Sequence, residues 1–288
     1  MNEQHVLLSG FEKVEDGMTI VDAIDEVRQK FPFAGYMDDK LRAYTDTATV
    51  VCRYLEPGAT ILDFGSGPCD KTGVLQALGY RCSAYDDLQD HWHSIQDNRA
   101  AIIEFAQSMD IDFRLANGEA PSFEKESFDL VLMHDIIEHL HDSPRELLND
   151  ILEWVKPNGY LFITVPNAVN IRKRIHVLFG KTNFPRFDSF YWYPNPWRGH
   201  VREYTKGDLV QMCRFLDLEI VELRSCHEYL KRLPRALRPA YVAITAMFPG
   251  WRDTWLLVAK KNVGWKVRRT CSDEEFKKAV GPYTSYRY

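Results

Sequence analysis

The stretch ILDFGSGPCD, residues 61–70, decides the fold. It ends a short apolar strand predicted at residues 60–64, after which Gly65 and Gly67 let the backbone turn sharply and let a ligand lie against the main chain. Asp86 ends the next predicted strand, nineteen positions after Gly67. In an open α/β sheet, a carboxylate at this position can bind both hydroxyls of a ribose. The stretch therefore predicts a nucleotide-type site at the carboxyl end of the sheet.

Strands and helices alternate outward from this stretch. Between the glycine loop and residue 166, short apolar runs that predict strands are separated by helical patterns; the strands fall at 81–85, 112–115, 128–133 and 160–165, and the helices at 74–78, 99–107 and 147–155. Earlier, a helix is predicted from Asp38 or Asp39, and later a helix at 206–216 and strands at 218–225 and 254–259. This alternation predicts βαβ units and a doubly wound parallel sheet.

The charge of the glycine loop favours one type of nucleotide ligand. A dinucleotide fingerprint needs a third glycine where this chain has Asp70. A carboxylate there would repel a pyrophosphate at the helix N-terminus, and Asp63 adds a second negative group. Adenosylmethionine has no phosphate and carries a sulfonium and an ammonium instead. The loop therefore favours the methyl donor over NAD.

Several segments in this order resemble class I S-adenosylmethionine-dependent methyltransferases, and are most similar to the ubiquinone-biosynthesis O-methyltransferase-like group. They are Asp63-x-Gly65-x-Gly67, Tyr85-Asp86, RLANGEAPSF (114–123), FDLVLMHDIIEHLHD (128–142) and WVKPNGYLFITVPN (154–167). The resemblance covers roughly residues 40–225. It implies an α/β fold with a mostly parallel, seven-stranded sheet, an antiparallel last strand, and S-adenosyl-L-methionine as cofactor.

The resemblance also implies roles for residues around the glycine loop. Asp63, Gly65 and Gly67 would line the methionine end of the cofactor, and Asp86 would bind its ribose. Asn117 stands where the family usually has an aspartate that receives the adenine amino group, and an amide oxygen can accept the same hydrogen bond.

Three further positions bear on this site. His134 ends the fourth predicted strand, which borders the ligand crevice of such folds, so we expect it to contact the cofactor. Cys69 stands where many relatives have a third glycine. Asn158 replaces the first glycine of the usual Pro-Gly-Gly turn, which is tolerable because asparagine visits the left-handed conformation.

Histidines are the candidates for acid–base chemistry. A hydroxyl acceptor must lose its proton, and imidazole titrates near neutral pH, so His139 or His200 is the expected base. Asp135, Glu138 and His139 would share one face if helical, and a similar segment in the ubiquinone-type relatives is associated with a divalent cation. Three ligands on one short turn rarely close a metal site, so we expect no metal.

Two unusual segments follow the fifth strand. Residues 184–197 hold seven aromatics in fourteen positions and form either a substrate wall or lid, or else a hydrophobic anchor or dimer contact. In the segment after it, His200 and Arg202 could orient a hydroxyl or an anionic group. The basic amphipathic stretches at 171–179 and 229–248 are interpreted as helix faces packed on the domain, with contact to an anionic membrane as the alternative.

Composition fits an ordinary globular protein. Hydrophobic residues make up 45% and charged residues 27%, and a net charge of −5 argues against a nucleic-acid partner. The six scattered cysteines indicate reduced thiols, and no signal peptide is recognisable, so we expect a cytoplasmic protein. We expect an N-terminal extension (1–37), a methyltransferase domain (38–261) with insertions near 167–205 and 227–253, and a polar tail (262–288).

The sequence therefore predicts an enzyme that moves a methyl group to an oxygen or nitrogen of a small-molecule, lipid-linked or glycan-type substrate. Two alternatives stay open at this point. One is a non-catalytic binding module that retained the fold, and the other is an NAD-dependent oxidoreductase, which Asp70 opposes. The acceptor and the oligomeric state are not predicted.

Overall fold

A seven-stranded sheet organises the chain in the computed structural model, which describes residues 17–281 apart from 119–120, 195, 229 and 231–232. Its strand order is β3-β2-β1-β4-β5-β7-β6. The strands are β1 Thr60–Phe64, β2 Arg81–Asp86, β3 Asp112–Leu115, β4 Phe128–His134, β5 Val155–Pro166, β6 Leu218–Cys226 and β7 Thr254–Lys261. Only β7 runs antiparallel to both of its neighbours, so the predicted sheet with an antiparallel last strand is confirmed.

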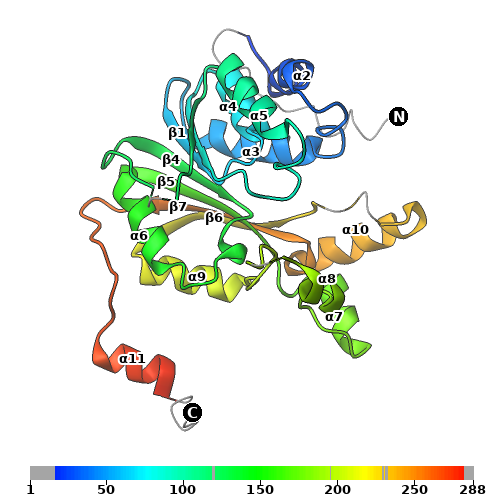
Figure 1. Cartoon of the computed structure of the whole chain (residues 1–288). Helices are drawn as coiled ribbons and strands as arrows, with labels where there is room; N and C mark the ends of the chain where they lie inside the picture. Colours follow the sequence, from blue (N-terminus) through cyan, green and yellow to red (C-terminus); the bar gives the residue numbers. More distant parts are fainter. Residues whose placement is uncertain (1–16, 119–120, 195, 229, 231–232, 282–288) are drawn as a thin grey trace.

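Helices cover both faces of this sheet (Figure 1). One face carries α2 Ile20–Lys30, α3 Leu41–Tyr54, α4 Asp70–Ala77 and α5 Asn98–Ser108. The other carries α6 Arg145–Trp154 and α9 Lys206–Phe215. α2 packs on α3 and α4, whereas α6 turns an apolar stripe to the sheet, formed by Leu148, Ile151 and Leu152, all buried.

The first helices begin where their capping residues allow. The hydroxyl of Thr19 and the carboxylate of Asp22 form a capping box at the start of α2. Helix α3 begins at Leu41 with Lys40 in the cap position, one or two residues after the predicted cap at Asp38 or Asp39, and no side chain caps it. Asp38 belongs to a turn in which its backbone NH donates to the carbonyl of Gly35. Because of this turn, the helix begins later in the chain.

Strand register brings the expected site residues to one edge of the sheet. β1 pairs with β2 and with β4, and the pairs Phe64 with Tyr85 and Asp63 with Leu132 place the ends of three strands together. The loops that follow these strands therefore lie at the same edge, as the doubly wound topology requires.

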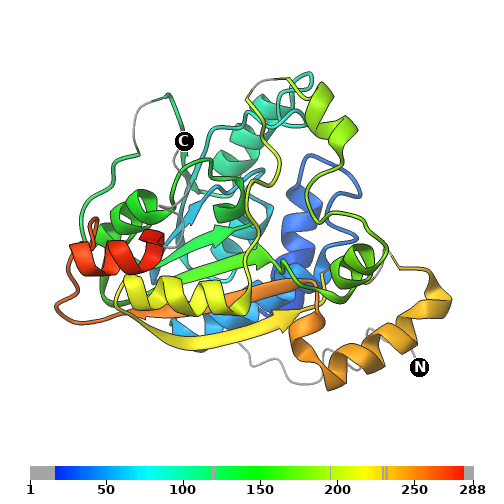
Figure 2. The ribbon, with the colours of Figure 1, turned by 90° about the horizontal axis from the view of Figure 1, so that it is seen from below.

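Three helices project beyond this edge, as Figures 1 and 2 show. They are α7 Ile171–Leu178, α8 Phe187–Trp192 and α10 Arg238–Met247, and the last follows a turn at Arg235–Leu237. Neither α7 nor α8 has a buried residue, so the interpretation of 171–179 as a packed helix face is wrong. The stretch at 229–248 lies partly outside the described residues, including Lys231 and Arg232; within it, α10 buries Tyr241 and Thr245.

The C-terminal segment, expected as a polar tail, contains a helix that was not predicted, α11 Asp273–Val280. Ser272 and Glu275 form a capping box at its start, which favours the helix in a polar sequence. The segment before it is held on α6, because Asn149 accepts a hydrogen bond from the backbone of Arg268 at 2.7 Å. None of the helices in the described chain has the length and apolar character needed to span a bilayer.

Candidate functional site

The loop between β1 and α4 depends on its glycines. Gly65 and Gly67 have φ angles of 75° and 55°, in the left-handed region that side chains disfavour. A Cβ atom on Gly65 would lie 2.1 Å from Cδ1 of Ile136, which follows β4. The loops after β1 and β4 therefore pack directly against each other. Cys69, in the third glycine position, adopts a glycine-like φ of 62°, and Asn158 has the predicted left-handed conformation at 64°.

Two buried carboxylates give this loop its acidic character. Asp63 is 2% exposed and accepts a 2.6 Å hydrogen bond from Thr72, and burial raises its pKa to about 6. Asp70 is the first residue of α4 and accepts a 2.5 Å hydrogen bond from the hydroxyl of Tyr44. A phosphate at this helix end would meet a fixed negative charge, which agrees with the exclusion of NAD.

Asp86 is held in place by the backbone around it. Its Oδ2 accepts a hydrogen bond from the Gly67 amide at 2.8 Å, and its Oδ1 accepts one from the Leu88 amide at 2.7 Å. Burial raises the pKa of this carboxyl. Each oxygen can still accept one more hydrogen bond, so the orientation suits two neighbouring ribose hydroxyls.

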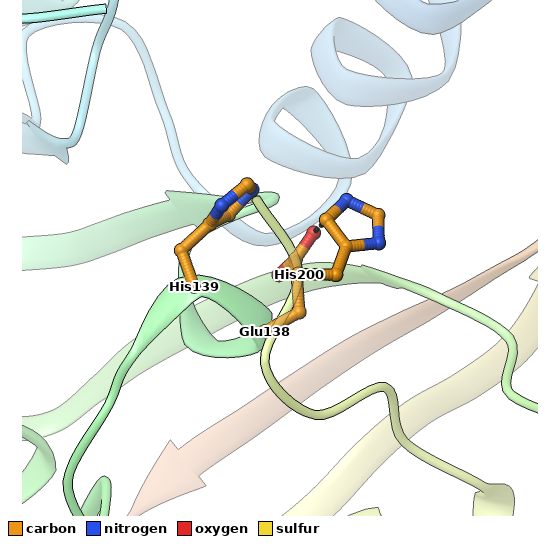
Figure 3. Close-up of side chains that lie close together, drawn as sticks. All are labelled: Glu138, His139 and His200. Atoms are coloured by element: carbon orange, nitrogen blue, oxygen red, sulfur yellow. Dashed lines mark ion pairs between the residues drawn. The ribbon is translucent and has the colours of Figure 1, made fainter. Parts of the chain in front are cut away.

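A second group of polar side chains lies beyond β4 (Figure 3). Glu138, His139 and His200 each offer one ligand atom, and these atoms lie within 4.8 Å of one another. The two imidazole rings have centroids 4.9 Å apart. The backbone NH of Val201 donates to the carbonyl of Glu138 at 2.7 Å, and this contact brings the two distant segments together.

Asp135 lies outside that group. Its φ of 55° interrupts any helix, and only Ile137–His139 form a short 3₁₀ turn. The expected helical face shared by Asp135, Glu138 and His139 is therefore wrong, because the turn brings Glu138 and His139 to His200 instead.

Glu138 is an unsatisfied carboxyl group. Its side chain is fully buried, and neither oxygen has a hydrogen-bond partner within the described part of the chain. Burial, with a further contribution from Asp135, raises its pKa to about 9. Such a group is costly for the fold and is typical of functional sites.

His200 is oriented by a carboxylate that sequence reasoning missed. Its Nδ1 lies 3.0 Å from Oε1 of Glu203, and Glu203 also pairs with the ammonium of Lys173. Burial opposes ionisation of Glu203, but the hydrogen bonds from His200 and Lys173 hold its pKa below the ordinary value. The signal was present in GHVREYT, where Glu203 follows His200 by three residues.

His139 is fixed by the same segment. Its Nδ1 lies 2.7 Å from the carbonyl oxygen of Arg198, so that nitrogen carries the proton and Nε2 is the free acceptor. Burial lowers the pKa of His139, which keeps the ring neutral near pH 7.

A cavity of about 600 Å³ opens beside His200. Its walls combine apolar and polar side chains, and they include Phe184, Pro185, Trp197, His200, Arg202 and Glu203. The aromatic segment thus contributes to a wall of this cavity, although Phe184 itself is 76% exposed. The volume lies within the range of small-molecule sites, about 300–1,000 Å³.

Comparison with known proteins decides the family. Residues 33–223 match the family model described as a methyltransferase domain. The chain belongs to this family. The predictions of a class I methyltransferase and of S-adenosylmethionine as its cofactor are confirmed, and the NAD-dependent alternative is set aside.

The curated relative is similar over one segment only. A ubiquinone biosynthesis O-methyltransferase from Parvibaculum lavamentivorans is 35% identical over 107 residues, which are 37% of this chain. The chain spans 40% of the length of that relative.

Solved structures share the fold at low identity. A putative methyltransferase in complex with the Trm112 activator of Haloferax volcanii has a TM-score of 0.54 and 18% identity, covering 85% of this chain and 97% of that one. An S-adenosylmethionine-dependent methyltransferase from Methanosarcina mazei has a TM-score of 0.50 and 17% identity, and the match covers 74% of this chain and 97% of that one. The [4+2]-cyclase SpnF has a TM-score of 0.52 and 16% identity, and the match covers 77% of this chain and 82% of that one. A cyclase with this fold shows that the fold alone does not determine the reaction.

The remaining predicted positions of this methyltransferase lie near the same edge. Asn117 follows β3 next to Ala116, whose backbone NH donates to the carbonyl of Asp86 at 2.9 Å. His134 ends β4 and is buried, with Nδ1 2.9 Å from the hydroxyl of Thr164 and its Nε2 without a partner in the described residues. Burial lowers the pKa of His134 well below its usual range, so the ring is neutral. Contact of either residue with the cofactor stays a prediction.

Lys71 is a second site residue that sequence reasoning missed. Burial lowers its pKa, but Asp135 and Glu228 outweigh burial and hold the pKa above the ordinary value. The ammonium is therefore charged beside the loop after β4. The available signal was a lysine in the first turn of the helix that follows the glycine loop.

Proposed function

We propose that this methyltransferase transfers the methyl group of S-adenosylmethionine to a hydroxyl oxygen of an acceptor with an apolar body, with His200 as the general base. The observation that carries the proposal is the pairing of His200 with Glu203 at the wall of the cavity. A carboxylate on Nδ1 fixes the tautomer of the ring and makes Nε2 the basic nitrogen.

Each protein group then has a defined task. The bound cofactor supplies an electrophilic methyl group on a sulfonium. Asp86 and the backbone at Gly65 and Gly67 would position it at the end of β1. Phe184 and Trp197 would hold the apolar part of the acceptor, and positioning of this kind is worth about 7–11 kcal/mol. His200 would remove the hydroxyl proton, and Lys173 keeps Glu203 in place behind it.

His139 supports the same chemistry from the opposite side. His139, His200 and Glu138 belong to one cluster, with one ligand atom of each within 4.8 Å of the others. A neutral His139 can accept a hydrogen bond from the acceptor, which would orient the hydroxyl toward His200. This assigns His139 a positioning role and His200 the proton transfer.

A metal-assisted mechanism is the second candidate, because one arrangement favours it. Nε2 of His200 lies 4.0 Å from Oε1 of Glu138, and His139 belongs to the same cluster, while the Nδ1 atoms of His139 and His200 are held by a carbonyl and by Glu203. Such outer partners are typical of metal-ligating histidines. These residues could hold a divalent cation, which would lower the pKa of the acceptor hydroxyl.

Release of adenosylhomocysteine from a panel of hydroxylated acceptors tests the proposal. Phenols with and without an alkyl chain test the apolar wall, and a matched amine tests the acceptor atom. His200→Ala should lower turnover by two orders of magnitude or more, because general base catalysis contributes about 10²–10⁴-fold. His200→Ala with near-normal turnover would rule out the base.

Chelation separates the two mechanisms. Exhaustive treatment with EDTA leaves turnover intact if His200 acts as a base without metal. It abolishes turnover, with rescue by Mg²⁺, if the cluster works through a cation. Adenosylhomocysteine binding without turnover of any acceptor would instead support the non-catalytic module.

A further inference from the structure

Exposed apolar side chains are concentrated in two segments, of which the first contributes to the wall of the cavity. In the described chain, 18 large hydrophobic side chains are exposed, and 13 of them lie in residues 175–192 and 237–248. We call residues 174–192 the apolar arm. Every residue of the arm except Pro185 is exposed, and its exposures reach 82% at Leu178 and 79% at Trp192. Apolar surface of this extent marks an interaction site.

The charges around this surface have one dominant sign. The arm contains Arg174, Lys181 and Arg186 against one acidic residue, Asp188. Residues 235–248 contain two arginines and no acidic residue. The whole chain has a net charge of −5, so the two segments differ from the rest of the molecule. Their basic charge is complementary to an anionic surface.

Contacts at its base hold the start of the arm, α7, near α10. Arg172, just before the arm, pairs with Asp253 at 2.8 Å, and the guanidinium of Arg174 lies 5.7 Å from the ring centre of Trp251. Trp251 belongs to the turn Pro249–Trp251 that follows α10. α7 and α10 therefore lie side by side, and both views show them on the same side of the molecule (Figures 1 and 2).

We propose that the apolar arm and α10 form a docking surface for an anionic phospholipid bilayer. Exposed tryptophan, phenylalanine and leucine next to lysine and arginine are the composition of segments that lie in the bilayer interface. The apolar side chains would enter the headgroup boundary, and the basic ones would contact lipid phosphates. No segment of the described chain crosses the bilayer in this arrangement, so the contact is peripheral.

The docking surface also indicates a class of methyl acceptor. This assignment of the acceptor, unlike the docking surface itself, rests on the proposed function. Phe184 and Pro185 belong to the arm and also line the cavity that contains His200. An acceptor dissolved in the bilayer would reach the cavity along these residues without passing through water. The acceptor class that fits is a hydroxylated ring or head group with a lipid tail.

Co-sedimentation with vesicles tests the proposal. We expect the full chain to bind vesicles that contain phosphatidylglycerol and not vesicles of phosphatidylcholine alone, with weaker binding at high salt. The pair Leu178→Glu and Phe179→Glu should lower the partition coefficient at least tenfold. The pair Lys181→Gln and Arg186→Gln should lower it roughly tenfold or more, since each basic residue near an anionic surface is worth about a fivefold change.

A matched pair controls for exposed apolar residues elsewhere. Val263 and Phe276 are 74% and 56% exposed but lie near the C-terminus, so Val263→Glu with Phe276→Glu should bind as the wild type does. The proposal would be overturned if the arm variants bound the vesicles as strongly as the wild type does. It would also be overturned if the wild-type chain sedimented with neither type of vesicle. A dimer that the Leu178→Glu and Phe179→Glu pair converts to a monomer, with no vesicle binding, would assign the arm to a second copy instead. Vesicle binding needs no turnover, so its failure is distinct from failure of the proposed reaction.

Discussion

Replacing Glu138 by glutamine should stabilise the protein. The carboxyl group is fully buried and neither oxygen has a hydrogen-bond partner in the described structure, so its ionisation is costly. Glutamine has nearly the same shape and cannot ionise. The substitution therefore removes the cost of the charge and leaves the packing unchanged. Gains of this kind are expected where a site is built for function.

The size of the effect follows from the pKa of Glu138. The carboxyl has an ordinary value of 4.5 and a folded value of about 9, so the folded chain holds the proton that the unfolded chain releases. Between these values the wild type loses stability as the pH rises, by about 1.4 kcal/mol per pH unit. At about pH 7.5 this loss is up to about 4 kcal/mol, and Glu138→Gln should recover about 1–4 kcal/mol of it.

Urea unfolding at a series of pH values measures this difference. The stability of Glu138→Gln relative to wild type should be close to zero near pH 5 and should grow steadily toward pH 8. Glu203→Gln is the matched control with the opposite sign, because the pKa of Glu203 is lowered by its partners and the charged form stabilises the fold above that pKa. A difference for Glu138→Gln that does not change with pH, or a destabilisation at pH 8, would refute the reasoning.

Further predictions concern the glycine loop and its neighbours. Asp86→Ala should weaken adenosylmethionine binding at least tenfold in calorimetry, because hydrogen bonds to a charged acceptor contribute about 1.5–3 kcal/mol each, whereas Asp112→Ala at the exposed start of β3 should not. Gly65→Ala should lower the stability by more than about 1 kcal/mol, from its positive φ alone, and should also displace Ile136; a normal melting temperature would contradict this. Glu203→Gln should lower kcat more than it raises KM, whereas an effect on KM alone would make Glu203 part of the binding wall.

Local sequence was enough to predict the sheet and the glycine loop. The strand at 60–64, its two glycines and Asp86 are close in the chain, and their spacing alone places them at one edge. The predicted left-handed conformation of Asn158 needed only the turn chemistry of that residue. Such features depend on neighbours a few residues away, which a single sequence displays directly.

The proposed catalytic cluster depends on contacts that sequence does not display. His139 and His200 lie close together because the backbone NH of Val201 donates to the carbonyl of Glu138. No local sequence pattern predicts this contact. The positive φ of Asp135 broke the helix that its spacing suggested. The stretch at 171–179 has the periodicity of a packed helix, yet α7 buries none of its residues within the described part of the chain. Periodicity predicts an apolar face, and only the tertiary structure shows whether a partner within the chain exists.

Transfer of radiolabelled methyl groups tests the central claim most directly. Wild-type protein is incubated with methyl-labelled adenosylmethionine and a lipid extract containing hydroxylated acceptors, and the label is measured in the organic phase. We predict label in the organic phase with wild-type protein, a loss of two orders of magnitude or more in initial rate with His200→Ala, and unchanged adenosylhomocysteine binding by that variant. Label that enters this phase equally fast with His200→Ala, or no label in any acceptor despite normal cofactor binding, would contradict the account.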